Sequence, residues 1–316
     1  MTTTVSNPSL GAPIVPLHLG GNTFGWTSGR EQSFAVLDAF QDAGGNVVDT
    51  ADMYSSWVPG HSGGESEEIL GAWMAARGNR DRVVIATKTG AHPEFTGLAH
   101  DTVVASLEAS LKRLRTDHVD LYYAHYDDES VEISDQVDTF DELVRSGKIR
   151  GVGLSNYSPA RMREFFTTAR QDGRTIPVAI QPQYSLVARK EYEQEYRPLA
   201  AEFDAAVFSY YSLASGSLTG KYSTPEDLQG SARQDAAQSY LTADGLEVVD
   251  TLDRIATAHG THIPTVALAW LRARSVTAPI TSASRPAQLP ALLAASSLRL
   301  TNEELGALDD ASQPFA

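Results

Sequence analysis

The chain has 316 residues, a formal net charge of −15 and no cysteine. The acidity argues against a nucleic-acid partner, because proteins that bind nucleic acids gain affinity by placing Lys and Arg on phosphates. The absence of cysteine excludes disulfides and thiolate nucleophiles and fits a cytoplasmic protein. No apolar run approaches the ~18 residues of a membrane helix, so no membrane association is expected.

Short apolar runs bounded by polar or glycine residues predict strands that are buried on both faces. The chain begins without a basic n-region or an unbroken apolar stretch, so a signal peptide is not expected. In chain order, the predicted strands lie near 16–20, 46–51, 82–88, 118–125, 149–155, 178–184, 205–210 and 277–282.

Amphipathic helices separate these strands. Apolar residues spaced three and four apart line one helical face, and this pattern predicts helices at 31–43, 65–77, 101–115 and 159–170. Residues 214–240 are polar and rich in Gly and Ser, which predicts a long loop, either a functional lid or a disordered segment.

Eight βα units without a break in composition predict a single (β/α)8 TIM barrel domain over residues 1–316. A doubly wound sheet would need a G-x-G-x-x-G turn after an early strand. The segment GGNTFG at 20–25 does not match that pattern, so the barrel is favoured.

Polar residues follow the predicted strands at their carboxyl ends, where barrel enzymes carry their active sites. Asp49, Tyr54, Lys88 and His125 would meet at the mouth of the barrel. A Tyr hydroxyl with an ordinary pKa of ~10 ionises reluctantly, and a nearby ammonium lowers that pKa. Asp49 would orient Lys88, Tyr54 would deliver a proton, and a His125 N–H would hold a carbonyl oxygen as negative charge develops on it.

From about Leu17 to Leu308 the chain resembles the aldo-keto reductase family, of a bacterial, NADP-dependent type. The resemblance is carried by NVVDTADMY, RVVIATK, LKRLRTDHVDLYYAH, SGKIRGVGLSNYS, IQPQYS and SLTGKY, in family order. It implies that the chain is an NADP-dependent oxidoreductase acting on a small carbonyl compound or alcohol. It also implies that Asp49, Tyr54, Lys88 and His125 form the catalytic tetrad.

The same resemblance implies the cofactor site. The nicotinamide would be held by Ser155, Asn156 and Gln181 with Tyr210 stacked on the ring, and Gly21 and Asn22 would lie beneath it. Leu213 and Gly216 would surround the pyrophosphate, and Ser212 and Lys221 would also bind the cofactor. The 2′-phosphate would meet Ser282, Ser284, Arg285, Gln288 and the free N–H groups of a helix starting near Pro286.

Two departures from the family bear on the cofactor. The segment Tyr210-Tyr211-Ser212-Leu213 replaces the common Tyr-Ser-Pro-Leu, and Arg285 is the only cation in TSASRPAQL. NADPH is therefore expected to be preferred over NADH, but less sharply than in relatives with two cations at this position.

Other interpretations stay open. A metal-dependent hydrolase or isomerase could use Asp49, Asp52, His61, His125, Asp127 and Asp128, although no H-x-H pair appears, and no metal is expected. A regulatory subunit that binds cofactor with little turnover is a second alternative. Trp26, Trp57 and Met53 are expected at the substrate site, and Trp73 and Trp270 in the core. Asp52 is expected to be an N-cap or a solvated turn residue, and His92, His100, His259 and His262 are expected to be solvated.

Overall fold

Eight parallel strands form one curled sheet in the computed structural model, which describes residues 5–7 and 12–316. The strand order is β11-β10-β9-β8-β5-β4-β3-β12. Backbone hydrogen bonds from Thr277 to Val207 and from Ile280 to Ser209, both 2.9 Å, join the two ends and close the ring. The strands are β3 (His18–Gly20), β4 (Val47–Asp49), β5 (Val84–Thr89), β8 (Val119–Ala124), β9 (Ile149–Ser155), β10 (Ala179–Gln181), β11 (Ala206–Val207) and β12 (Ile280–Thr281).

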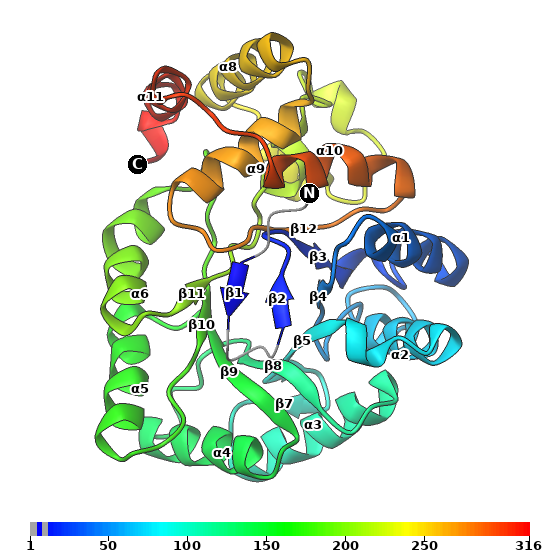
Figure 1. Ribbon diagram of the computed structural model, residues 1–316, viewed down its shortest axis with the longest axis vertical. Helices are drawn as coiled ribbons and strands as arrows, with labels where there is room; N and C mark the ends of the chain where they lie inside the picture. The colour runs from blue at the N-terminus through cyan, green and yellow to red at the C-terminus, as the bar shows by residue number, and fades with distance from the viewer. Residues whose placement is uncertain (1–4, 8–11) are drawn as a thin grey trace.

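Helices surround this ring (Figure 1). They are α1 (Arg30–Asp42), α2 (Glu65–Arg77), α3 (His100–Leu114), α4 (Ile133–Arg145), α5 (Pro159–Gln171), α6 (Arg197–Phe203), α8 (Ala243–His259), α9 (Ile263–Ala273), α10 (Leu289–Leu293) and α11 (Asn302–Ala311). The predicted (β/α)8 fold is confirmed, with each of the eight strands at its expected place. That the whole chain is a single domain stays a prediction.

Every second side chain of a strand points into the barrel, because successive side chains point to opposite faces of the sheet. These inward-pointing side chains fill the barrel interior. Val47, Val84, Leu121 and Ala179 pack together inside the ring. The side chains two residues further along β4, β5, β8 and β10 also point inward, and from there the interior becomes polar towards the carboxyl ends. The same register that builds the core therefore also aims the candidate site residues.

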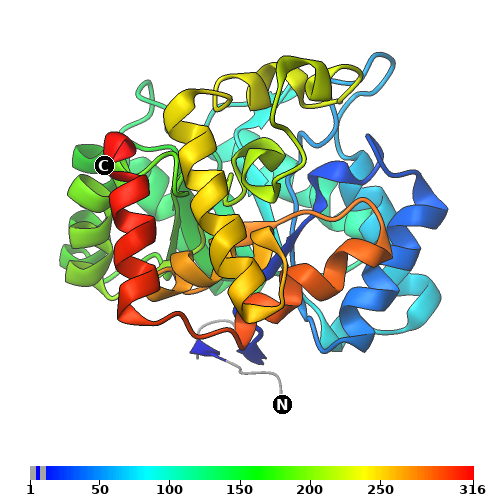
Figure 2. The same ribbon diagram turned by 90° about the horizontal axis from the view of Figure 1, so that it is seen from above.

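Two short hairpins were not predicted from the sequence. β1 (Val5–Asn7) pairs with β2 (Ala12–Ile14), and β6 (Ala91–His92) pairs with β7 (Phe95–Thr96). The first hairpin lies at the amino-terminal end of the barrel, and the segment 214–240 lies at the opposite end (Figure 2). Ile14 enters the interior cluster, so the first hairpin closes the end that carries no site residue.

The segment 214–240 has structure of its own, which corrects the expectation of a plain loop. It contains two 3-10 segments, η5 (Ala214–Thr219) and η6 (Pro225–Leu228), and the short helix α7 (Gln234–Gln238). Tyr222, Leu228 and Ala237 are buried against one another and form a small apolar cluster. This cluster holds the segment together, since polar composition alone could not.

Candidate active site

A buried ion pair lies at the carboxyl ends of β4 and β5. Lys88 is fully buried, and its Nζ donates hydrogen bonds to Asp49 Oδ1 at 2.5 Å and to the Thr50 carbonyl at 2.7 Å. The second Asp49 oxygen accepts from Gln181 Nε2 at 2.8 Å. Burial lowers the pKa of Lys88, but the Asp49 carboxylate and the Tyr54 phenol outweigh it and hold that pKa above its ordinary value. The lysine is therefore charged at neutral pH.

Tyr54 lies beside this pair, partly exposed at the mouth. Its ring centroid is 5.2 Å from Lys88 Nζ and 6.2 Å from the His125 ring. Burial raises the pKa of the Tyr54 phenol and outweighs the opposing effect of the Lys88 ammonium. The expected net lowering is therefore wrong. Lys88 acts in the expected direction, yet the phenol stays protonated at neutral pH and keeps a proton to donate.

His125 completes the group at the end of β8. Burial, followed by the Lys88 charge, holds the pKa of His125 well below its ordinary value. The ring is therefore neutral, with one nitrogen available as a donor and the other as an acceptor. Within the described residues, His125 Nδ1 has no hydrogen-bond partner. The structure thus brings all four predicted catalytic residues together.

The predicted nicotinamide residues form one connected cluster next to this group. Asn156, at a φ of 53°, donates through Nδ2 to the His125 carbonyl at 2.8 Å and to Ser155 Oγ at 3.1 Å. Ser155 Oγ donates to the Gln181 carbonyl at 2.9 Å, and the Tyr210 hydroxyl donates to Asn156 Oδ1 at 2.9 Å. These bonds fix the Asn156 side chain at the mouth of the barrel, and the bond to Asp49 fixes that of Gln181.

Asn22 marks a second part of the site, where β3 ends. Its Oδ1 accepts from Ser282 Oγ at 2.6 Å and from Arg233 Nη2 at 3.4 Å. The Arg233 guanidinium lies 5.7 Å from the Trp26 ring and makes no ion pair with a carboxylate in the described part of the chain. Sequence reasoning missed Arg233, because nothing in the polar stretch SARQD places it beside Asn22, 211 residues earlier.

The η5 turn supports part of the predicted pyrophosphate site. Ser215 and Gly216 have φ values of 56° and 99°, so the backbone there is left-handed. A Cβ at Gly216 would lie 2.9 Å from Lys221 Nζ, so the glycine leaves room for the ammonium to fold back over the turn. Leu213 begins this turn and is half-buried. The turn and Lys221 are therefore adjacent.

Ser212 and Gln288, two of the predicted cofactor residues, form hydrogen bonds within their own loops. Ser212 is buried, and its hydroxyl donates to the Ser209 carbonyl at 2.9 Å. Gln288 Oε1 accepts from the backbone N–H groups of Ser284 and Arg285 at 2.8 and 3.0 Å. The Gln288 side chain therefore caps the two N–H groups that precede the helix, and the use of the helix's own N–H groups by a phosphate stays a prediction. Arg285 itself is exposed.

Aromatic side chains surround the mouth. The Trp26 and Trp57 rings meet edge to face at 5.6 Å, and Trp57 meets Tyr54 at 5.7 Å. Tyr126 lies against His125 at 4.8 Å, and Tyr211 against Tyr210 at 5.2 Å. Trp57, Tyr126 and Tyr211 are 42%, 49% and 49% exposed, and they are three of the four exposed large hydrophobic side chains of the described residues.

For the residues that were predicted to lie outside the active site, the observed burial agrees with the prediction in some cases and not in others. Trp73 and Trp270 are buried as predicted, and His100, His259 and His262 are exposed. Asp52 and His92 were expected to be solvated and are instead almost completely buried. Both lie behind the site, where helices α2 and α3 cover the strand ends, and a burial of this kind leaves no local pattern in the sequence.

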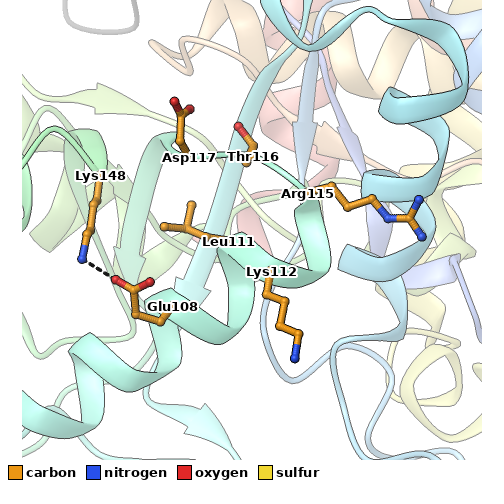
Figure 3. Close-up of a pocket in the computed structure, with 7 residues that line it drawn as sticks. All are labelled: Glu108, Leu111, Lys112, Arg115, Thr116, Asp117 and Lys148. Atoms are coloured by element: carbon orange, nitrogen blue, oxygen red, sulfur yellow. Dashed lines mark hydrogen bonds and ion pairs between the residues drawn. The ribbon is translucent and has the colours of Figure 1, made fainter.

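No three His, Asp or Glu side chains within residues 5–7 and 12–316 are arranged so that they could hold a metal ion. Helices of the described residues likewise include none that could span a membrane. A depression of about 860 Å³ lies between the end of α3 and the starts of β8 and β9 (Figure 3). It is lined by charged residues, and its Lys148 and Glu108 are paired with each other. It lies at the barrel end opposite the tetrad, so it is no part of this site.

The residues at the mouth fit a nicotinamide dinucleotide. Gly20 and Gly21 give the wall by β3 a bare backbone, because a Cβ there would meet Ser282 Oγ at 2.6 Å and Ser66 Oγ at 2.9 Å. The amides of Asn156 and Gln181 can face a carboxamide. The Arg233 and Lys221 cations can face a pyrophosphate.

The pattern of the aldo/keto reductase family matches residues 16–313. An aryl-alcohol dehydrogenase of Pestalotiopsis microspora is 32% identical over 316 residues, covering 94% of this chain and 79% of that protein. An aldo-keto reductase of Bacillus subtilis is 31% identical, with 90% and 85% coverage. A probable voltage-gated potassium channel subunit beta of Oryza sativa is also 31% identical, with 84% and 82% coverage. The chain therefore belongs to the aldo/keto reductase family and is an oxidoreductase that interconverts carbonyl compounds and alcohols.

Proposed function

We propose that Tyr54 is the proton donor of carbonyl reduction, assisted by Lys88, Asp49 and His125. The observation that carries this proposal is the buried Lys88–Asp49 pair beside the Tyr54 ring. A lysine is almost never fully buried unless it is paired, and this one lies where a phenolate would form. When bound, the nicotinamide cofactor supplies the hydride, and the chain's own residues handle the proton and the charge.

The protonation state of each tetrad residue determines its role. A carbonyl that accepts a hydride develops negative charge on oxygen, and the neutral His125 ring can donate a hydrogen bond to it. The protonated Tyr54 then gives up its proton, and the phenolate left behind is stabilised by the Lys88 ammonium. Asp49 and the Thr50 carbonyl hold the lysine in place, so its charge costs little reorganisation during the reaction.

NADPH is the proposed cofactor, with NADH accepted more weakly. Arg285 is the available cation for the 2′-phosphate, and it is exposed and free of ion pairs among the described residues. Because Gln288 caps the neighbouring N–H groups, the preference rests mainly on one charge-assisted contact. Such contacts contribute roughly 1.5–3 kcal/mol, which corresponds to a preference of about tenfold to a hundredfold.

An aromatic carbonyl compound or alcohol is the proposed substrate class. Trp26, Trp57 and Tyr126 offer flat apolar surface around Tyr54 and His125. Offset and edge-to-face ring contacts add about 0.5–1.5 kcal/mol beyond the burial of area. The Pestalotiopsis relative is named an aryl-alcohol dehydrogenase, which agrees with this class. Cytoplasmic location, a bacterial source and the oligomeric state stay untested.

The test is an assay of NADPH oxidation with benzaldehyde and with an aliphatic aldehyde of equal carbon number, for wild type and Tyr54→Phe. We expect benzaldehyde to be the better substrate by kcat/KM. The variant should lose at least 100-fold in kcat while its Kd for NADPH stays unchanged. Tight NADPH binding without turnover in the wild type would instead support a cofactor-binding regulatory protein.

A further inference from the structure

A polar layer lies behind the catalytic strand ends, between the barrel and helices α2 and α3. Barrel strands and their helices usually meet through apolar side chains. Here the outward-facing and adjoining residues are polar and buried, with side chains at most 15% exposed. The layer consists of Thr50, Asp52, Ser66, Glu67, Thr87, Thr89, Ser106, Arg113 and Tyr122.

One half of the layer is fully hydrogen-bonded. Thr50 Oγ1 donates to Ser66 Oγ at 2.8 Å, and Ser66 Oγ donates to the Gly21 carbonyl at 2.8 Å. Glu67 accepts from Thr87 Oγ1 at 2.5 Å and from Arg113 Nε at 2.7 Å. These contacts pair Glu67 with Arg113, the only cation of the layer.

In the other half of the layer, three polar atoms have no hydrogen-bond partner among the described residues. Asp52 Oδ2 accepts from Ser106 Oγ on α3 at 3.0 Å, but Asp52 Oδ1 has no partner in the described part of the chain. Thr89 Oγ1 and the Tyr122 hydroxyl, which are neighbours of each other, also have none. A buried carboxylate with a free oxygen costs much more than a neutral carboxyl, whose hydroxyl can donate.

Asp52 is tied to the segment that carries Tyr54. Its backbone N–H donates to the Lys88 carbonyl at 3.2 Å, and the Tyr54 N–H donates to the Ala51 carbonyl at 3.2 Å. The side chain of Asp52 fastens this turn to α3 through Ser106. A shift of Asp52 would therefore move the Tyr54 ring relative to Lys88.

We propose that Asp52 is a positioning residue whose neutral carboxyl seats the 49–54 segment against α3, and that its ionisation displaces Tyr54 and lowers turnover. This inference rests on the proposed role of Tyr54. It predicts that activity falls as pH rises because Asp52 ionises, and not because a residue of the tetrad changes its charge.

The charges around Asp52 favour this behaviour. Glu67 on α2 repels a charge on Asp52, while Arg113 on α3 attracts it but is already paired with Glu67. Tyr122 on β8 is neutral, and the buried His92 on β6 has a pKa lowered first by burial. Burial and then Glu67 raise the pKa of Asp52 to about 7, and Ser106, Arg113 and the Met53 backbone N–H partly oppose this. The carboxyl therefore changes charge in the range where enzymes are assayed.

The experiment measures kcat for aldehyde reduction between pH 5 and 10, together with the Kd for NADPH at each pH. We expect the wild type to lose activity several-fold with a midpoint near neutral pH. Asp52→Asn mimics the neutral carboxyl. Its kcat should therefore stay at the plateau value for at least one pH unit beyond the pH at which the wild type begins to lose activity. Ser106→Ala removes a hydrogen bond that favours the charged form, so its midpoint should move up. The Kd should not change in either variant.

Asp120→Asn serves as the matched control, because Asp120 is equally buried but is paired with Arg80 and Arg150 at the other end of β8. Its midpoint should equal that of the wild type. The inference would be overturned if the midpoint pH of the activity loss were the same in Asp52→Asn, Ser106→Ala and the wild type. It would also be overturned if Asp120→Asn shifted that midpoint as much as Asp52→Asn does.

A direct readout that needs neither activity nor the variants is the carboxyl ¹³C titration of Asp52 in the wild type. A midpoint near neutral supports the inference, and one below about 5 overturns it. Tyr54→Phe with full activity would refute the role of Tyr54 but leave this titration unaffected, so the two failures can be told apart.

Discussion

Replacing Lys88 with Met tests the tetrad most directly, since the side chains have similar volume and the ammonium is lost with its hydrogen bonds to Asp49 and Thr50. The Lys88 Nζ lies 5.2 Å from the Tyr54 ring centroid, where phenolate charge would spread. Two unit charges at that separation interact by about 3 kcal/mol at an effective dielectric constant of about 20. Each ~1.4 kcal/mol is tenfold in rate, so we expect kcat to fall by roughly 200-fold, measured by NADPH oxidation under saturating aldehyde.

The same substitution leaves the Asp49 carboxylate buried with only Gln181 as a side-chain partner. Breaking a buried pair in this way costs about 3–5 kcal/mol of stability, so a lower Tm is also expected. The double variant Lys88→Met with Asp49→Asn separates the two effects, because it removes the unpaired charge. Stability should largely return while kcat stays low. A double variant that regains wild-type kcat would refute the electrostatic role of Lys88.

Further predictions concern the cofactor, the tetrad and pH. Tyr54→Phe should abolish most turnover without weakening NADPH binding, as fluorescence quenching can measure. Arg285→Ala should bring the Kd values for NADPH and NADH closer together, and an unchanged ratio would exclude Arg285 from the 2′-phosphate site. Arg233→Ala should weaken both cofactors alike by about tenfold, since one charge-assisted contact to a group they share is lost. The raised pKa of Asp52 adds stability that is fully present below pH ~4 and is lost as pH rises to about 7. Asp52→Asn should therefore gain in urea unfolding free energy over the wild type between pH 4 and pH 8.

The inward-facing half of the site was predictable because one rule places it. Asp49, Lys88 and His125 each end an apolar run, and parallel strands in a barrel bring such ends to one rim. The alternation that buries Val47 and Val84 inside also points Asp49 and Lys88 inward. The local sequence pattern and the barrel fold therefore both place these three residues at the carboxyl-terminal rim of the barrel.

The remaining features depend on contacts between distant segments. Asp52 meets Ser106 across 54 residues, and Arg233 meets Asn22 across 211. Neither pairing follows from a periodicity, because the partners lie on different elements whose packing the sequence does not encode locally. The cap formed by Gln288 was not predictable for another reason. Its amide oxygen caps the backbone N–H groups of Ser284 and Arg285, a contact that the sequence pattern does not specify.

The carboxyl ends of β4 and β5 are polar on both faces, and this sets them apart from the rest of the barrel. Asp49 and Lys88 face the interior, while Thr50, Thr87 and Thr89 face α2 and α3. At the other end of the same strands, Val47 and Val84 pack on apolar neighbours. Apolar packing is non-directional, whereas hydrogen bonds fix angles and distances. The end closed by the first hairpin therefore holds the fold together. The end at the mouth holds side chains in set positions, and a change of charge on either face of its strands reaches Tyr54.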